Sequence, residues 1–300
     1  MRAYDFVTLD VFTETPFEGN PLAVLPDATG LDPGLMQRIA AEFNLSETAF
    51  VLPGSPPSVR IYTPREELPF AGHPTIGTAH ALVRAGTLDP SGPEGAALVE
   101  AAGTVRLTRD EALAPGAIFL HAPVDPARGP DLPEPGLLAG MLRLAASDLH
   151  PHWPPEAWSA GVPFACIALR DPALLARIAF DVSTWTQLLR GTRAEKVYVF
   201  APGAAPGQIA ARMFAPSLGI GEDPATGAAA VALAGYLARH AGPPEPDTRV
   251  DWEIAQGTHM GRPSRLLLQY GVTAGGAASV RLGGHAVVVS EGRLLLPAAN

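Results

Sequence analysis

Three ionisable side chains stand where the chain changes direction and are the candidates for chemistry: Glu47, His73 and Asp223. Glu47 follows the turn in NLSETAFV (44–51) and precedes an apolar run. Partial dehydration there favours the protonated acid that an acid/base catalyst needs. The alternative for Glu47, taken alone, is a capping or solvated turn residue.

His73 lies between a glycine and a proline in FAGHPTIGTAHALVRAG (70–86). Proline suits the first turn of a helix, where its missing N–H costs nothing, and apolar residues then recur at helical spacing. The sequence therefore predicts a helix over 74–86 with His73 at its mouth, where free backbone N–H groups bind anions. An ordinary loop histidine is the alternative.

The chain contains a similar pattern twice, about half its length apart. GHPTIGTA (72–79) matches EDPATGAA (222–229), and VRIYTP (59–64) matches ARMFAP (211–216). A strand that ends in Pro-Gly precedes each pair, at AFVLPG (49–54) and VFAPG (199–203). The repeat makes Asp223 the counterpart of His73. Similar lobes commonly form their ligand pocket between them, so we expect both helix mouths to bind one anion there.

The elements that must position these residues are short strands and a few helices. We expect an α+β fold of two pseudo-symmetric lobes, each a β-barrel-like sheet around a central helix. The N-terminal lobe is predicted at 1–124, completed by 288–300, and the C-terminal lobe at 125–287, with 123–135 as a proline-rich linker. Helices are predicted at 33–43, 74–86, 135–146, 172–190 (broken) and 224–240. Strands are predicted at 2–12, 20–26, 48–53, 58–63, 97–109, 117–123, 161–170, 195–201, 208–215, 248–257 and 264–271, with a final hairpin at 279–297 that returns to the first lobe.

Composition excludes several classes of function. The 300-residue chain has a net charge of −9 and scattered arginines, which argues against a nucleic-acid surface. It has no long apolar run and no signal peptide, so we expect a cytoplasmic protein without membrane association. Dinucleotide and P-loop glycine motifs are absent, so no nucleotide cofactor is expected. The single cysteine, Cys166, excludes a disulfide framework and is expected to be a core residue.

Taken together and in order, four motifs resemble the phenazine-biosynthesis PhzF-like family. They are DVFTETPFEGNPLAVLP (10–26), NLSETAFV, FAGHPTIGTAHAL and GEDPATGAAA, and QGTHMGRPSRL (256–266) and VRLGGHAVVV (280–289) are similar to later motifs of the family. The resemblance implies a diaminopimelate-epimerase-like fold with the site between two lobes. It also implies a cofactor-independent isomerase acting on a small carboxylic acid, similar to trans-2,3-dihydro-3-hydroxyanthranilate isomerase.

The resemblance assigns the catalytic glutamate to Glu47 and the active-site histidine and aspartate to His73 and Asp223. Backbone or side chains of Gly72, Thr226, Gly227 and Ala228 are then expected to bind the substrate. Characterised isomerases of the family have D-x-x-T-G-S where this chain has Ala228 in the last position. The missing hydroxyl brings the phenazine precursor into question as the substrate. We also expect a homodimer, with neither a metal nor an organic cofactor.

Other functions stay open at this stage. An epimerase with two facing thiols is excluded by the cysteine count, but another epimerase or a non-catalytic carboxylate-binding protein would have the same cleft. His150 and His152 are weak candidates for a metal site. Lys196 stands six residues before Pro202-Gly203, as Glu47 stands six before Pro53-Gly54. In the cleft its ammonium would favour ionised Glu47 and oppose its role as an acid; a solvated lysine is the alternative.

Overall fold

The computed structural model describes residues 2–242, 248–272 and 278–296, and divides the chain into two compact units. Unit 1 is Met1–Pro123 with Gly283–Asn300, and unit 2 is Val124–Leu282. The chain passes from unit 1 to unit 2 after Pro123, which is within the expected linker at 123–135. The chain returns to unit 1 at Gly283, five residues before the expected position 288, because Ala286 and Val287 already pair with Val11 and Asp10.

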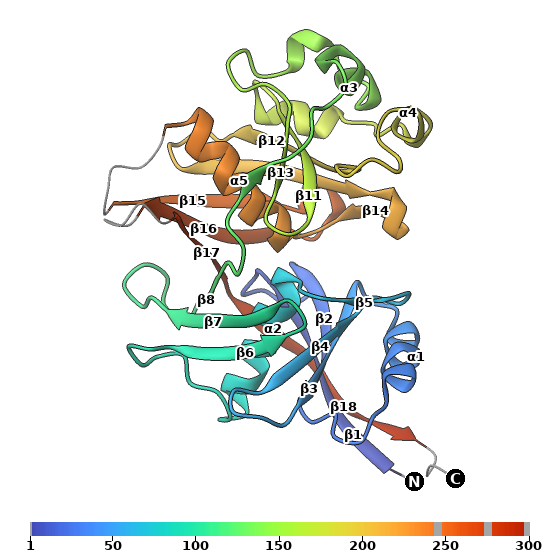
Figure 1. Cartoon of the computed structure of the whole chain (residues 1–300), viewed down its shortest axis with the longest axis vertical. Coiled ribbons are helices and arrows are strands. Elements are labelled where there is room, and N and C mark those ends of the chain that lie inside the picture. The colour runs from blue at the N-terminus through green and yellow to red at the C-terminus, as the bar shows by residue number, and fades with distance from the viewer. Residues whose placement is uncertain (1, 243–247, 273–277, 297–300) are drawn as a thin grey trace. The chain divides into compact units, whose positions relative to one another are not determined.

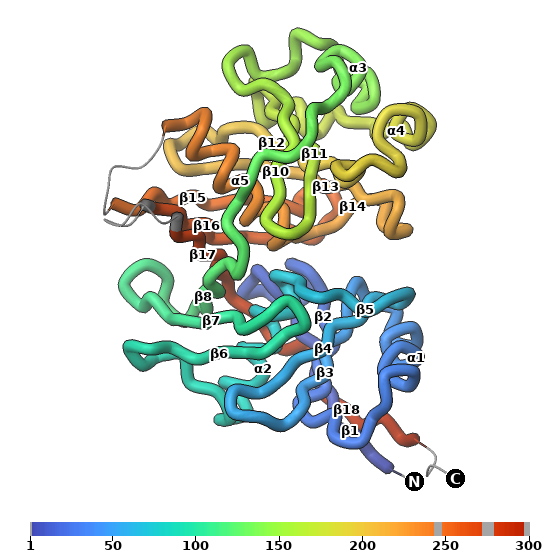
Figure 2. Tube along the Cα trace, in the orientation of Figure 1, coloured from blue at the N-terminus to red at the C-terminus, as the bar shows by residue number. Residues whose placement is uncertain are grey.

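Unit 1 is a twisted sheet of short strands with one central helix and one outer helix (Figure 1). Its strands are β1 (Arg2–Val11), β2 (Asn20–Leu25), β3 (Glu47–Leu52), β4 (Ser58–Tyr62), β5 (Glu67–Leu68), β6 (Ala96–Glu100), β7 (Gly103–Arg109), β8 (Ile118–His121) and β18 (Ala286–Leu296), and its helices are α1 (Pro33–Phe43) and α2 (Gly72–Arg84). Strand β1 pairs antiparallel with both β2 and β18, so the ends of the described chain run side by side (Figure 2).

The two helices of unit 1 have different environments because their sequences differ in pattern. Helix α2 is buried on all sides over its first eight residues and contacts β1, β2, β3, β8 and β18. Helix α1 is amphipathic and buries only Met36, Ile39 and Ala40, against Phe50 and the rest of one apolar cluster. A helix whose small, apolar and hydrogen-bonded residues occupy every side is surrounded by other elements, whereas a helix with a single apolar face covers one side of a sheet.

Unit 2 repeats this plan. Its strands are β9 (Ala127–Arg128), β10 (Glu156–Ser159), β11 (Pro163–Ala168), β12 (Lys196–Pro202), β13 (Gln208–Ala215), β14 (Ile220–Asp223), β15 (Arg249–Gln256), β16 (Ser264–Val272) and β17 (Ala278–Gly284), of which β17 ends across the boundary; its helices are α3 (Pro135–Met141), α4 (Val182–Leu188) and α5 (Gly227–His240), with short 3-10 turns at Ala146–Asp148, Pro172–Arg177, Pro216–Leu218 and Thr258–Met260. Helix α5 contacts β9, β10, β11 and β16 and is almost wholly buried. The α+β architecture expected from the sequence is confirmed.

Several predicted elements needed correction. The predicted strand at 97–109 is the β6–β7 hairpin, turned at Ala101–Ala102. The predicted hairpin at 279–297 is wrong, because only His285 separates β17 from β18 and a hairpin turn needs at least two residues. Strand β18 instead pairs with β1 and returns to unit 1 as expected. No helix of the described residues is long and apolar enough to cross a membrane.

Both central helices approach their sheets through glycines. A Cβ built on Gly77 of α2 would lie 2.5 Å from a Leu22 methyl and 2.7 Å from a Val11 methyl. On Gly235 of α5 it would lie 2.4 Å from the Trp158 ring and 2.7 Å from Pro126. Real Cβ atoms do not come this close, so glycine sets how near each helix packs.

We expect Gly235→Ala to lower the free energy of unfolding by about 1–3 kcal/mol, because overpacking against the Trp158 indole outweighs the better helix propensity of alanine. Gly140→Ala in α3 is the matched control, since a Cβ there meets no atom within 4 Å. The control should raise stability by roughly 0.5–1 kcal/mol. Urea unfolding of both variants measures the difference, and equal effects would show that the Trp158 contact does not limit the packing of α5.

Candidate active site

Glu47 and His73 lie together in unit 1. Glu47 is the first residue of β3 and His73 is the second residue of α2. Oε2 of Glu47 is 3.4 Å from Nε2 of His73, and the side chains are 14% and 5% exposed. The helix starts at Gly72, two residues before the predicted start, so His73 is inside the first helical turn and not before it.

The tautomer of His73 follows from its hydrogen bonds. The ring bonds to the backbone of Pro21, and because a proline backbone offers only a carbonyl, the imidazole must donate. Nε2 has no hydrogen-bond partner among the described residues, so the donor is Nδ1. The neutral ring therefore directs the Nε2 lone pair towards Glu47.

The Glu47–His73 contact differs from an ordinary ion pair. Burial lowers the pKa of His73 to about 3, and the Pro21 bond only partly opposes this, so the imidazole is neutral at physiological pH. Two lone pairs at 3.4 Å repel, so the contact is attractive only with a proton between the two atoms. A proton on Glu47 would make the contact attractive, and the acid form is also the state that general acid catalysis requires.

Strand pairing fixes this geometry. Strands β2 and β3 run parallel with Leu22 opposite Glu47, which places the neighbouring Pro21 carbonyl beside the start of β3. Ser46 also donates a 3.3 Å hydrogen bond to the side chain of buried Asn20. Asn20 and Pro21 thus help to position the pair, a role that the sequence motif alone did not disclose.

Asp223 ends β14 in unit 2 and is buried. Its Oδ2 accepts a 2.5 Å hydrogen bond from the hydroxyl of Thr226, the N-cap residue of α5. The helix therefore begins at Gly227 and not at the predicted residue 224, because Asp223 is still paired with Met213 in the sheet. Asp223 and His73 belong to different units, so their action on one ligand stays a prediction.

Gln256 organises the Asp223 loop. The side chain is fully buried; its Nε2 donates to the Asp223 carbonyl at 2.8 Å and to the Thr226 hydroxyl at 3.0 Å. Its Oε1 accepts from the Tyr198 hydroxyl at 3.2 Å and from the Thr226 N–H at 3.3 Å. Sequence analysis missed this role, although Gln256 opens the QGTHMGRPSRL motif.

An arginine–glutamate pair secures the strand before each site loop. Arg60 makes two hydrogen bonds of 2.7 and 2.6 Å to Glu67, and these hold the pKa of Glu67 below its ordinary value. Arg212 makes the same double contact with Glu222, at 2.8 and 2.7 Å. Each guanidinium also lies over the aromatic ring two residues on, Tyr62 or Phe214. The matching Arg positions in VRIYTP and ARMFAP were the sequence signal for these pairs.

The remaining candidates occupy simpler positions. Gly72 is the first residue of α2, and Gly227 and Ala228 are the first two residues of α5. Lys196 opens β12 opposite Phe164 just as Glu47 opens β3 opposite Leu22, but whether it reaches a ligand stays a prediction. Cys166 is fully buried, as expected of a core residue, and burial raises its pKa.

No group of three or more His, Cys, Asp or Glu side chains in the described ranges could hold a metal ion. His150 packs its ring against Trp153, with centroids 4.7 Å apart.

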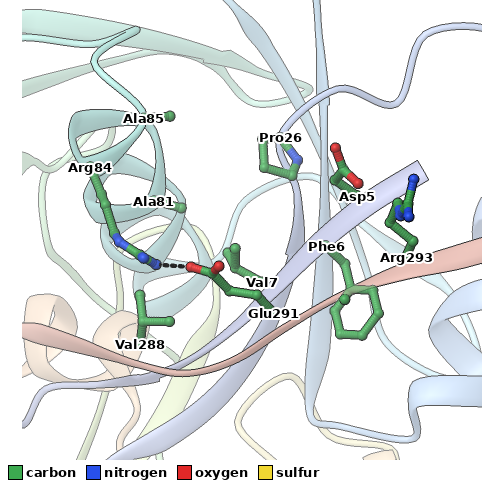
Figure 3. Close-up of a pocket in the computed structure, with 11 residues that line it drawn as sticks. Asp5, Phe6, Val7, Pro26, Ala81, Arg84, Ala85, Val288, Glu291 and Arg293 are labelled. Carbon is green, nitrogen blue, oxygen red and sulfur yellow. Dashed lines mark ion pairs between the residues drawn. The ribbon is translucent and has the colours of Figure 1, made fainter. Parts of the chain in front are cut away.

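Unit 1 also has a pocket of about 540 Å³ (Figure 3), and neither Glu47 nor His73 lines it. It is lined by the C-terminal end of α2, including Arg84, and by residues of β1 and β18, including Asp5 and Arg293. Arg84 forms an ion pair with Glu291 there, and both side chains are about half exposed, so the pair adds little stability. His73 is at the other end of the same helix.

Comparison with known proteins identifies close relatives along almost the whole chain. The phenazine biosynthesis-like protein family, PhzC-PhzF, matches residues 9–292. An uncharacterized isomerase of Mesorhizobium japonicum is 40% identical and covers 99% of this chain and 100% of the relative. Trans-2,3-dihydro-3-hydroxyanthranilate isomerase of Pseudomonas fluorescens is 34% identical and covers 98% of this chain and 100% of the relative.

Solved structures give the same result for the fold. A PhzF-family protein of Bacillus anthracis has a TM-score of 0.89 at 23% identity, covering 99% of this chain and 100% of its own. A predicted epimerase of Pseudomonas aeruginosa has a TM-score of 0.75 at 31% identity, covering 98% and 100%. A probable proline racemase of Agrobacterium radiobacter, at a TM-score of 0.62 and 14% identity over 98% and 93%, shares the fold, and the diaminopimelate-epimerase-like architecture is confirmed. Relatives named as isomerases support an isomerase, and the chain belongs to the phenazine biosynthesis-like, or PhzC-PhzF, family.

Proposed function

We propose that this protein is a cofactor-independent isomerase that moves a proton on a small carboxylic acid, with Glu47 carrying the proton. The observation that carries the proposal is the buried contact between Oε2 of Glu47 and the unprotonated Nε2 of His73. A carboxyl group held in its acid form beside a neutral base gives a proton to one carbon and accepts one from another. The relative named trans-2,3-dihydro-3-hydroxyanthranilate isomerase makes a cyclic diene acid the first substrate class to test.

In this mechanism the other residues hold the substrate. Asp223 faces a loop whose backbone and hydroxyl groups are already fixed by Gln256, and so it is suited to bind a donor group such as a substrate amine or hydroxyl. The first N–H groups of α2 and α5, at Gly72, Gly227 and Ala228, are suited to bind the carboxylate. His73 sets the protonation of Glu47. The homodimer and cytoplasmic location expected from the sequence stay predictions.

Two alternatives are distinguished by one measurement. A non-catalytic binding protein with the same residues would bind the acid but leave its carbon-bound hydrogens unexchanged in deuterated water. An epimerase, the class named for one relative of 31% identity, would incorporate deuterium and invert a centre without moving a double bond. The isomerase incorporates deuterium at a carbon that gains a proton as the double bond moves.

Glu47→Gln should lower the turnover of trans-2,3-dihydro-3-hydroxyanthranilate by at least roughly 10²–10⁴-fold, because an amide cannot accept and return a proton. Binding of the same acid, measured by calorimetry, should change much less. Glu42→Gln is the matched control, an exposed glutamate of α1 that should leave turnover unchanged. Near wild-type turnover and deuterium incorporation by Glu47→Gln would remove Glu47 from the mechanism.

Gln256→Met should impair both stability and catalysis, because it leaves the Asp223 carbonyl, the Thr226 N–H and the Tyr198 hydroxyl without their buried partner. Each such group costs roughly 1–3 kcal/mol of unfolding free energy. Below the unfolding temperature the folded variant should also have a raised KM. Tyr198→Phe removes one of these bonds and should have a small effect on KM. A folded Gln256→Met enzyme with wild-type KM would show that substrate binding does not depend on this loop.

Ala228→Ser should strengthen binding of trans-2,3-dihydro-3-hydroxyanthranilate by at least about tenfold if the family hydroxyl contacts the substrate, since one hydrogen bond to a charged group contributes roughly 1.5–3 kcal/mol. Ala228→Cys is the control, similar in volume but a weak hydrogen-bond donor. Steady-state KM and kcat decide the matter. Equal KM values in all three enzymes would place substrate choice at other residues.

A further inference from the structure

A second buried carboxyl lies close to α2 and has no part in the proposed mechanism. Glu100 is the last residue of β6 and is 4% exposed. Its Oε1 lies 2.6 Å from the hydroxyl of Thr75, in the first turn of α2. Its Oε2 is buried and has no hydrogen-bond partner among the residues that the structure describes.

The geometry of Thr75 decides the protonation of this carboxyl. The hydroxyl has one proton and two close oxygen neighbours, the Ala71 carbonyl at 2.7 Å and Glu100 Oε1 at 2.6 Å. A carbonyl can only accept. Both contacts are hydrogen bonds when Thr75 donates to Ala71 and Glu100 donates to Thr75, which requires a neutral carboxylic acid.

The surroundings of Glu100 offer no compensating charge. Strand β6 packs against β4, β7 and the start of α2. The ionisable side chains of these three elements contact other groups. These contacts are Arg60 and Tyr62 with Glu67, Arg106 with the carbonyls of Pro93 and Glu94, Arg109 with Glu111, His73 with the backbone of Pro21, His80 with the carbonyl of Gly284, and Arg84 with Glu291. Burial raises the pKa of Glu100 to about 7, and the Thr75 hydrogen bond partly opposes this rise.

The β6–β7 turn holds the start of α2 at two points. The Ala102 N–H donates a 2.9 Å hydrogen bond to the Pro69 carbonyl, which precedes the helix, and Glu100 contacts Thr75 within it. Gly72 and His73 lie between these two points. Movement of this turn would therefore move the imidazole that faces Glu47.

We propose that Glu100 is a positioning residue that, as a neutral carboxylic acid, holds the first turn of α2 through Thr75 and keeps His73 against Glu47. The inference rests on the proposed function for its effect on catalysis. Ionisation removes the proton that Glu100 donates, so one of the two short contacts of Thr75 becomes repulsive and the turn loosens. Activity then declines as pH rises through 7.

The same ionisation affects stability with a definite sign. The pKa of Glu100 is raised from 4.5 in an exposed chain to about 7 in the fold, so between these values the native state binds more protons than the unfolded state. Stability contributed by this group is therefore greatest at low pH and is lost as pH rises from about 4.5 to 7. Glu100→Gln has no proton to lose and should not show this component.

The test compares wild type, Glu100→Gln and the control Glu94→Gln, an exposed glutamate just before β6. Wild type and control should lose kcat/KM for trans-2,3-dihydro-3-hydroxyanthranilate about tenfold per pH unit above pH 7. Glu100→Gln should retain activity within about threefold of wild type at pH 6 and should lack this alkaline decline, because its amide donates to Thr75 at every pH. An unchanged alkaline decline in Glu100→Gln would overturn the inference.

Two further measurements keep the test independent of folding and of the substrate. Thr75→Val keeps the volume but removes the hydroxyl; it should lower kcat at every pH and also lose the alkaline decline. Nitrogen NMR of the His73 ring, without substrate, should report a pH-dependent shift near pH 7 in wild type and none in Glu100→Gln. If the NMR shift is present but the enzyme does not turn over the substrate, the result contradicts the proposed function but not the role of Glu100. If turnover depends on Glu47 but the NMR shift is absent, the result supports the proposed function and contradicts the role of Glu100.

Discussion

The burial of a neutral histidine beside a carboxyl is the constraint on which unit 1 depends. A buried polar group is stable only when its hydrogen bonds are satisfied, so the imidazole of His73 needs an acceptor for Nδ1. The Pro21 carbonyl meets that need because β2 starts at Asn20 and pairs in register with β3. Gly77 in turn lets α2 approach Leu22 closely enough for this contact. The hydrogen bond from His73 to Pro21 therefore depends both on the pairing register of β2 and β3 and on the close packing of α2.

The internal repeat extends from the sequence to the side-chain contacts that hold each loop in place. Arg60 and Arg212 have the same double contact with a glutamate and the same position over an aromatic ring. In each unit the glutamate lies on a short strand that leads into the site loop, and Glu222 directly precedes Asp223. A bidentate, partly buried pair is rigid compared with a flexible surface ion pair, so it fixes where the loop begins.

Sequence patterns predicted the regular parts of the fold well, because those patterns report local physics. Helix α1 has the predicted bounds, since Asp32 caps it and Asn44 ends it in a left-handed conformation. The starts of α2 and α5 were displaced in opposite directions, because tertiary contacts determine them: Thr75 bonds back to Ala71 in α2, whereas Met213 and Gln256 hold Asp223 outside α5. The helix propensity of a single proline does not report these tertiary contacts.

The candidate site divides in the same way. Glu47, His73 and Asp223 were predicted from their positions beside turns; the structure places the first two in contact, and a catalytic role for the three stays a prediction. The residues that support them could not be found, because Gln256 and Glu100 lie far along the chain from Asp223 and Thr75 and look like ordinary strand residues. Only the register of β15 and β6 brings them to their loops.

Comparison of the two units suggests why the repeat diverged where it did. The supporting positions are the same, with arginine, glutamate, an aromatic ring and a close-packed central helix in both. The candidate site positions differ: Glu47 corresponds to Lys196, and His73 corresponds to Asp223. In the proposed mechanism, proton transfer requires a carboxyl group that is stable in its neutral form, and burial beside His73 favours that form. Orientation of a polar ligand requires a group whose own position is fixed, which the hydrogen bonds of Thr226 and Gln256 provide for the Asp223 loop. One scaffold therefore suits either role, and in the proposed mechanism the residue at the loop determines which role each unit takes.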